Sequence, residues 1–312
     1  MQAHDLSEVQ RWVYWLSNVN PVTIAASDSD LAVIDYSVDG TDATAFDRED
    51  VVRMKRRADG KQRILLGYLS VGEAEEYRYY WKSEWMKKAS LFRKSKRPAW
   101  LDKENPDWEG NYKVHYWDPE WQAIIFGSPD AYLDKIIAQG FDGVYLDIID
   151  GFEYYEKERP AAVEEMANFV SELAAYARSK AGEDFLIFGQ NGLRLLAVDT
   201  YLNALNGVGK EDLFFREPSK AERAAGITAS VLPSDESEIN FSMPFLAMAQ
   251  EAGKLVLNIE YPAGDPKLAM IAVERSRKAG FLPLIAHREL ETINPPQPVW
   301  IKPKQLATLS FI

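Results

Sequence analysis

The sequence lacks cysteine altogether, and histidine occurs only 3 times in 312 residues. The absence of thiols excludes disulfide bonds, thiolate catalysis and cysteine-based zinc sites. No GxGxxG motif follows the first predicted strand, and no GxxxxGK[ST] motif occurs in the chain. Neither a dinucleotide site nor a P-loop is therefore predicted, and we expect no cofactor and no metal ion.

Long apolar runs are also missing. No stretch approaches the roughly 20 apolar residues of a membrane span, and the start, MQAHDLSEVQRW, has no apolar signal core. We expect no membrane span and an extracellular or periplasmic protein whose signal is absent from this sequence, with a cytoplasmic location as the alternative. The formal net charge of −12 disfavours nucleic acid as a partner. We expect a monomer.

Aromatic residues, in contrast, are plentiful. They make up 12% of the chain, with 9 Trp and 15 Tyr. Each of them could belong to the core, but together they exceed what a core requires. Because Trp and Tyr combine a flat apolar face with a polar group, they indicate a groove for flat ligands such as sugar rings.

Buried-type strands alternate with helical segments along the whole chain. Trp12 to Asn18 is interpreted as a short amphipathic piece ahead of them. Eight strand–helix units predict an α/β protein, a single closed (β/α)8 barrel over residues 1–312 with its core at about 30–290, on which a proline-rich tail packs. The predicted strands span 31–37, 63–70, 114–118, 144–150, 185–192, 201–213, 254–261 and 281–286.

The fourth predicted strand lies in the stretch GFDGVYLDIIDGFEYY, which ends in two acids. Asp147 and Asp150 follow a run that is apolar on both sides, as in a buried parallel strand. Carboxylates are rare in a dry core unless they are paired or used. Their spacing of three predicts that they point to opposite faces of the strand, so they do not readily share one metal ion.

Polar residues end the other predicted strands as well, and in a barrel these ends converge on one face. Such a carboxylate-rich cluster suits either a magnesium site or the two-carboxylate chemistry of glycoside hydrolysis. No compact acidic metal motif is present, so the second is favoured. The strand-end residues are Asp35, Tyr68, Ser70, Glu73, His115, Asp118, Asp147, Asp150, Gln190, Asn191, Glu211, Asn258, Glu260 and His287.

Several of these stretches resemble one known family. In order they are DLAVIDYSVDG, ILLGYLSVGEAEEYRYYW, PAWL followed by YKVHYWDPEWQ, GFDGVYLDIIDGFEYY, FGQNG and GVGKEDLFF. The chain is similar to glycoside hydrolase family 114, the endo-α-1,4-polygalactosaminidase-like barrels. The resemblance covers roughly Trp12 to Arg288, and it is strongest to a bacterial and archaeal subgroup of hydrolases whose substrate is open.

The resemblance implies an endo-acting glycoside hydrolase that cleaves an α-linked amino-sugar polysaccharide such as polygalactosamine. The acids at the ends of strands four and six fall on Asp147, the implied nucleophile, and Glu211, the implied acid. The alternatives are a carbohydrate-binding barrel with little or no catalysis and a hydrolase of another α-hexosaminide. Substrate-binding positions are expected at Asp35, Tyr68, Glu73, Tyr116, Asp150, Asn191 and Tyr261, and the aromatic residues Phe152, Tyr154 and Tyr155 form either a sugar platform or part of the rim.

Overall fold

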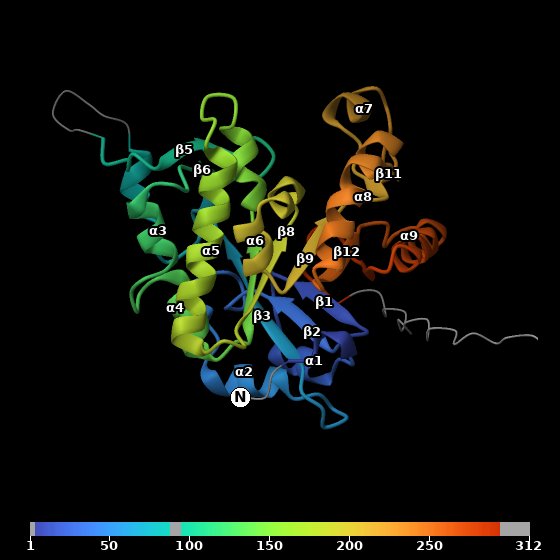
Figure 1. Cartoon of the computed structure of the whole chain (residues 1–312), viewed down its shortest axis with the longest axis horizontal. Coiled ribbons are helices and arrows are strands. Elements are labelled where there is room, and N and C mark those ends of the chain that lie inside the picture. The colour runs from blue at the N-terminus through green and yellow to red at the C-terminus, as the bar shows by residue number, and fades with distance from the viewer. Residues whose placement is uncertain (1–3, 88–94, 294–312) are drawn as a thin grey trace, which may run out of the picture.

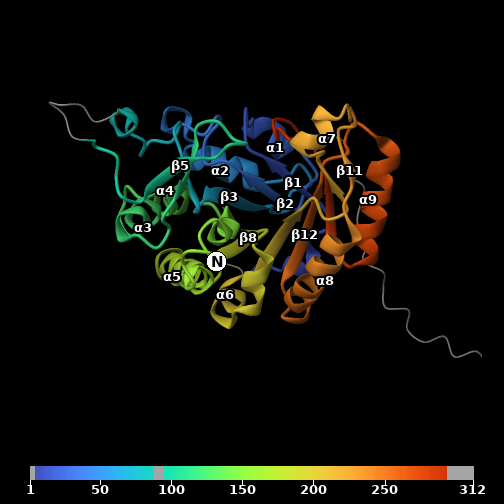
Figure 2. The same cartoon turned by 90° about the horizontal axis from the view of Figure 1, so that it is seen from above.

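Eight parallel strands form the centre of the molecule, as the computed structural model shows for the residues that it describes, 4–87 and 95–293. Neighbouring strands pair in the order β1, β2, β3, β7, β8, β9, β12 and β13. Their curved arrangement is visible in Figures 1 and 2 and confirms the predicted (β/α)8 architecture. The strands are β1 (Trp12–Trp15), β2 (Leu31–Ile34), β3 (Ile64–Ser70), β7 (Gly143–Asp147), β8 (Leu186–Gln190), β9 (Gly207–Glu211), β12 (Leu255–Glu260) and β13 (Leu282–Ile285).

Helices form the outer layer and lie around the strands in Figure 2. The local sequence explains several of their ends: Asp47 caps α2, and Asp118 accepts a hydrogen bond from Glu120 N at the start of α3, where Pro119 takes the first helical position. The helices are α1 (Pro21–Ala26), α2 (Arg48–Lys55), α3 (Pro119–Ile125), α4 (Tyr132–Gln139), α5 (Ala162–Ala181), α6 (Asp199–Ala204), α7 (Lys220–Ala224), α8 (Glu236–Glu251) and α9 (Pro266–Lys278).

Two strand predictions were wrong: one barrel strand was missed and one predicted strand does not belong to the barrel, so the total of eight is unchanged. The segment beginning at Trp12 is the first barrel strand, buried on both faces and paired in parallel with β2. The predicted third strand, 114–118, is not part of the barrel. The stretch 111–114 instead forms β6 (Asn111–Val114), which pairs antiparallel with β4 (Glu73–Glu75) and β5 (Leu101–Glu104). The strand that ends at Asp147 is therefore still the fourth in the sheet.

Two insertions stand at the carboxyl ends of the barrel strands. The first, β4–β5–β6, lies in the chain between β3 and β7. The second lies between β9 and α8 and contains β10 (Phe215–Arg216), α7 and β11 (Leu232–Pro233). Both occupy the upper part of Figure 1, toward which the labelled strand arrows point. The predicted packing of the C-terminal tail falls mainly on 294–312, outside the described residues.

The sheet has one join without a strand ladder. Among the described residues no ladder connects β13 to β1. The indole of Trp12 instead donates to the carbonyl of Leu282 at 3.2 Å, and Leu16 N donates to the carbonyl of Leu290 at 2.8 Å. We call this join the seam.

Arg63 fixes the opposite end of the barrel, where β3 begins. Its side chain is 1% exposed and is surrounded by neutral acceptors. It donates to the carbonyls of Ser29 at 3.0 Å and Ser27 at 2.7 Å, and also to the carbonyl of Met54. Burial lowers the pKa of this guanidinium to about 10. The group therefore donates to three main-chain carbonyls, of which those of Ser29 and Met54 are contacted in the buried interior.

Candidate active site

A pocket of about 460 Å³ opens at the carboxyl ends of the barrel strands. Its volume is within the range of small-molecule sites, about 300–1,000 Å³. Each barrel strand contributes a lining residue from its carboxyl-terminal half or from the residues just beyond it. In strand order these residues are Tyr14, Asp35, Tyr68, Asp147, Gln190, Glu211, Tyr261 and Arg288.

Asp147 is the last residue of β7, and three groups donate to its half-buried carboxylate. The hydroxyl of Tyr68 on β3 donates to Oδ2 at 2.7 Å, and the main-chain N–H of Ile148 donates to Oδ1 at 2.8 Å. The third donor is the amide of Gln190. Burial raises the pKa of Asp147 well above its usual range, and the charge of Glu211 raises that pKa further.

Gln190 joins the two acids of the site. Its Nε2 donates to Asp147 Oδ1 at 3.1 Å and to Glu211 Oε2 at 2.8 Å. Because both bonds start from one nitrogen atom, these two oxygens lie no farther apart than about 6 Å; retaining glycosidases space their carboxyl groups by about 5–5.5 Å and inverting ones by about 6.5–9.5 Å. This upper bound, for one oxygen of each acid, lies below the inverting range.

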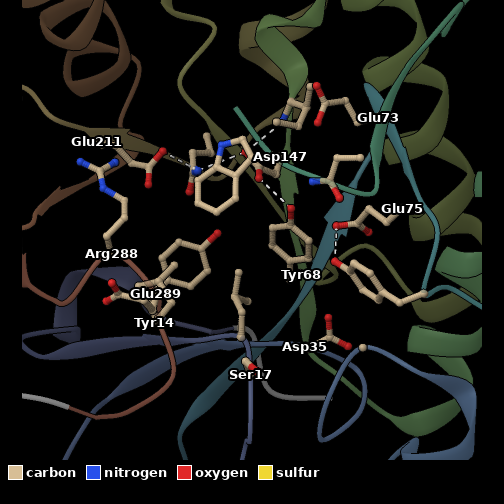
Figure 3. A pocket seen from close by; sticks show the side chains of 18 of the residues that line it. Tyr14, Ser17, Asp35, Tyr68, Glu73, Glu75, Asp147, Glu211, Arg288 and Glu289 are labelled. Atoms are coloured by element: carbon tan, nitrogen blue, oxygen red, sulfur yellow. Dashed lines mark hydrogen bonds between the residues drawn. The ribbon is translucent and has the colours of Figure 1, made fainter. Parts of the chain in front are cut away.

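Glu211 ends β9 on the opposite side of this amide. Asn191 Nδ2 donates to its Oε2 at 3.1 Å, and the hydroxyl of Tyr261 donates to its Oε1. Asn191 adopts a left-handed backbone (φ 58°), which Asn tolerates better than most residues and which turns its side chain back toward β9. Burial raises the pKa of Glu211. Figure 3 shows Asp147 between Glu211 and Glu73 across the pocket.

Asp150 lies in the same pocket as Asp147, so the prediction that the two acids face apart was wrong. It assumed that the strand continues through Asp150. The strand instead ends at Asp147, Ile148 adopts a left-handed backbone (φ 54°), and a 3-10 helix, Ile149–Tyr154, follows. Burial raises the pKa of Asp150 to about 7, and the charges of Glu153 and Glu211 contribute to that rise.

A buried ion-pair network forms the opposite wall. Arg78 donates through Nη1 to Asp35 at 2.7 Å and through Nε to Glu75 at 2.6 Å. Tyr77 adds a hydrogen bond from its hydroxyl to Glu75 at 2.6 Å. Burial raises the pKa of Asp35 even though the adjacent guanidinium opposes that effect. One cation thus lies between two carboxylates, as a rigid and negatively charged wall.

Glu73 lies on β4 and completes this side of the pocket. Its Oε1 accepts hydrogen bonds from Asn105 Nδ2 at 2.9 Å and from the hydroxyl of Tyr154 at 3.3 Å. Burial raises the pKa of Glu73. The structure thus brings eight of the nine expected site residues to one pocket.

Tyr116 is the expected residue that the structure places elsewhere. It is fully buried, it is absent from the pocket lining, and its hydroxyl donates to the carbonyl of Ala162 at 2.7 Å. Phe152 and Tyr155 also lie outside the lining; Phe152 is buried, and Tyr155 donates to Asp102 at 3.1 Å. His115 stacks on a neighbouring tryptophan, with ring centroids 4.9 Å apart, and does not line the pocket.

Several lining residues were missed by sequence reasoning. Tyr14 escaped because its strand was not recognised. Gln190 was noted as a strand-end residue, but nothing in the sequence showed that its amide reaches two acids. Arg78 lies outside the barrel strands, so no strand end pointed to it. Arg288 pairs with Asp212 at 2.7 Å, and these two residues are 76 positions apart in the chain. The sequence held one signal for these arginines: the strand ends carry more acids than bases, and buried acids need cations as partners.

A (β/α)8 barrel whose fourth and sixth strands end in facing carboxylates has the architecture and the functional groups of glycoside hydrolases. The chain belongs to glycoside hydrolase family 114, which it matches over residues 2–299, and it is a glycoside hydrolase.

Relatives extend over most of the chain. An uncharacterized protein of Methanocaldococcus jannaschii is 38% identical over 297 residues, which cover 91% of this chain and 78% of the relative. An uncharacterized protein of Deinococcus radiodurans is 37% identical over 299 residues, which cover 94% and 85%. One of Thermotoga maritima is 34% identical over 292 residues, which cover 90% and 81%.

Among solved structures, the glycoside hydrolase domain of PelA from Pseudomonas aeruginosa has a similar fold. The TM-score is 0.65 at 17% sequence identity, and the match covers 92% of this chain and 98% of that domain. Within residues 4–87 and 95–293, no helix is long and apolar enough to cross a membrane.

Proposed function

We propose that the chain hydrolyses an α-linked amino-sugar polysaccharide of the polygalactosamine type, cutting within the polymer. The charge of the pocket lining carries this proposal. Eight carboxylate side chains and two guanidinium groups line the pocket, and both guanidinium groups are already paired with carboxylates. Such a lining attracts a cationic sugar, because the negative field in a cleft concentrates positively charged ligands.

Asp147 and Glu211 perform the reaction in two steps. Asp147 attacks the anomeric carbon while Glu211 gives its proton to the glycosidic oxygen, so the bond between that carbon and the leaving sugar breaks. Glu211 then removes a proton from water, the water attacks the same carbon, and the bond to Asp147 breaks. Two displacements retain the anomeric configuration, in agreement with the short distance between the acids.

Hydrogen bonds favour the ionised form of both acids. Ile148 N and Tyr68 donate to Asp147, Asn191 and Tyr261 donate to Glu211, and Gln190 donates to each. The assignment of Asp147 as the nucleophile and Glu211 as the acid therefore follows the family resemblance. Two half-buried acids that face one amide share a single proton most readily, because a second negative charge nearby raises the pKa of the pair.

The test measures new reducing ends from polygalactosamine, partly N-acetylated galactosaminoglycan and other hexosamine polymers. We expect the free-amine polymer to be cut fastest, into a ladder of oligosaccharides, and the first product to keep the α configuration by NMR. If another α-hexosaminide is cut faster, that polymer takes the place of polygalactosamine as the proposed substrate. Binding of a polymer without new reducing ends would contradict the catalytic roles of both acids.

A long charged polymer does not cross a lipid bilayer unaided, so we propose an extracellular or periplasmic place of action, where the enzyme can meet it. Fractionation of the native host, followed by immunodetection, tests that location. The monomeric state stays a prediction, which light scattering of the purified protein tests.

A further inference from the structure

Trp108 has an unusual position for a tryptophan. Its side chain is 54% exposed, yet it lines the active-site pocket. It lies in the turn 105–110, which connects β5 to β6 in the first insertion. A single exposed apolar residue is common on protein surfaces and carries no meaning by itself. The position of Trp108 at the pocket is what distinguishes it.

The turn that carries Trp108 is held by hydrogen bonds of its own. Asn111 N donates to the carbonyl of Trp108 at 3.2 Å, and Asp107 N donates to the side chain of Asn105 at 3.0 Å. Asn105 N donates to the carbonyl of Asn111 at 2.7 Å. These bonds fix the backbone on both sides of the indole.

Two further contacts anchor the turn to separate parts of the site. The amide of Asn105 donates to Glu73 in the pocket wall at 2.9 Å. On the other side, Lys220 Nζ lies 2.7 Å from the carboxylate of Asp107. Because Lys220 opens α7, the second insertion contacts the turn as well. A turn whose backbone is fixed before the ligand arrives loses less entropy when the ligand binds.

The surroundings of Trp108 suit one face of a sugar ring. A pyranose presents a flat patch of C–H groups surrounded by hydroxyl or amino groups, so it needs both an apolar plane and polar partners. Glu73 and Asn111 line the same pocket as the indole and supply the polar partners. The aromatic residues expected from the sequence do not line the pocket. Lys113 lies over the ring of Tyr154, whose hydroxyl donates to Glu73, and Tyr155 donates to Asp102.

We propose that Trp108 is the stacking surface of a sugar-binding subsite in this pocket, where it holds one ring of the polymer while another ring is cleaved. The proposal rests on the proposed polysaccharide substrate. It assigns Trp108 to binding and not to the bond-breaking step, so its loss weakens the affinity for polymer and leaves kcat unchanged.

The experiment compares Trp108→Ala, Trp108→Leu and Trp108→Phe with the wild type. The matched control is Phe241→Ala, which removes an aromatic ring on α8 that is 51% exposed and lies away from the pocket. The substrate is whichever hexosamine polymer the wild type cuts fastest, and binding to it is also measured in the Glu211→Gln background. We expect KM and Kd to rise about tenfold for Ala and Leu, less for Phe, and not for the control.

Three results would overturn the proposal: binding by the Ala and Leu variants within twofold of the wild type, equal loss in the Phe241 control, or a fall in kcat with KM unchanged. Failure of polygalactosamine alone is a separate outcome, because the comparison then continues on the polymer that is cut. If the wild type neither cuts nor binds any polymer, both the proposed substrate class and the proposed Trp108 subsite are wrong. Should one variant fail to fold, the ranking of the other two decides.

Discussion

Gln190 donates a hydrogen bond of 3.1 Å to Asp147 from the adjacent strand of the barrel, and the same nitrogen atom also reaches Glu211. An amide that donates to both acids stabilises their charged forms. It also fixes the distance between them, on which the proposed mechanism depends.

The first prediction concerns this amide. Replacing Gln190 with Leu removes a donor to each carboxylate, so the pKa of the acid pair rises. We expect kcat to fall on the order of 10- to 100-fold and the acidic limb of the kcat/KM profile to move to higher pH. Steady-state kinetics from pH 4 to pH 9 would show both effects. An unchanged profile would contradict the bridging role of Gln190.

The second prediction concerns the acids themselves. Asp147→Asn and Glu211→Gln should each lower turnover on polymer by several orders of magnitude while the circular dichroism spectrum stays that of the wild type. With an aryl glycoside whose leaving group needs no proton, the Glu211 variant should recover its first step and the Asp147 variant should not. The reverse pattern would exchange the two roles, and near-normal activity of either variant would remove it from the mechanism.

The third prediction concerns Asp150. Burial raises its folded-state pKa to about 7, whereas an aspartate in the unfolded chain has its ordinary pKa of 3.8. Between these two pKa values, Asp150 is protonated in the native state and ionised in the unfolded state. It therefore lowers the free energy of unfolding as the pH rises from 4 to 7, and this destabilisation is complete above pH 7. Asp150→Asn removes this destabilisation, because the amide does not ionise.

Urea unfolding tests that statement at pH 5 and pH 8. The variant should gain about 1–2 kcal/mol over the wild type at pH 8, a figure reduced for the partial exposure of the group, and less at pH 5. Exposed Asp130→Asn is the matched control and should show no such difference. A gain that does not depend on pH would refute the titration of Asp150 as its cause.

The fourth prediction concerns Arg63 at the opposite end of the barrel. Arg63→Met removes the guanidinium donor from the buried carbonyls of Ser29 and Met54 and from the partly buried carbonyl of Ser27. We expect the free energy of unfolding to fall by about 3–5 kcal/mol, with KM unchanged in the folded protein. Exposed Arg48→Met serves as control in the same urea titrations. Equal stability of the two variants would show that the carbonyl contacts contribute little.

The sequence predicted the architecture because eight buried segments separated by helices permit few other folds. It misassigned two strands for a physical reason. The aromatic stretch 114–118 suits a barrel strand by its composition, yet only Val114 of it lies in a strand, at the end of β6 in a small antiparallel sheet. The strand β1, with four residues, has no alternation of polar and apolar positions that would identify it. Burial alone does not say which sheet a strand joins.

The candidate site was predicted where side chains follow directly from strand ends, as at Asp147 and Glu211. It was not predicted where the backbone leaves the strand geometry. The left-handed residue Ile148 brings Asp150 into the pocket, and no hydrophobic pattern encodes that turn. Tyr116 shows the converse, since an aromatic residue near a strand end packs inward when a main-chain acceptor is available there.

The seam between β13 and β1 also has a mechanical consequence. Leu16, Ser17 and Leu290 line the pocket where the seam reaches its rim, and there the two sides meet through isolated hydrogen bonds instead of a ladder. A ladder resists opening as a unit, whereas isolated bonds yield one at a time. We therefore expect an occupant of the pocket to displace the wall more easily at the seam than at the paired strands that carry Asp147 and Glu211.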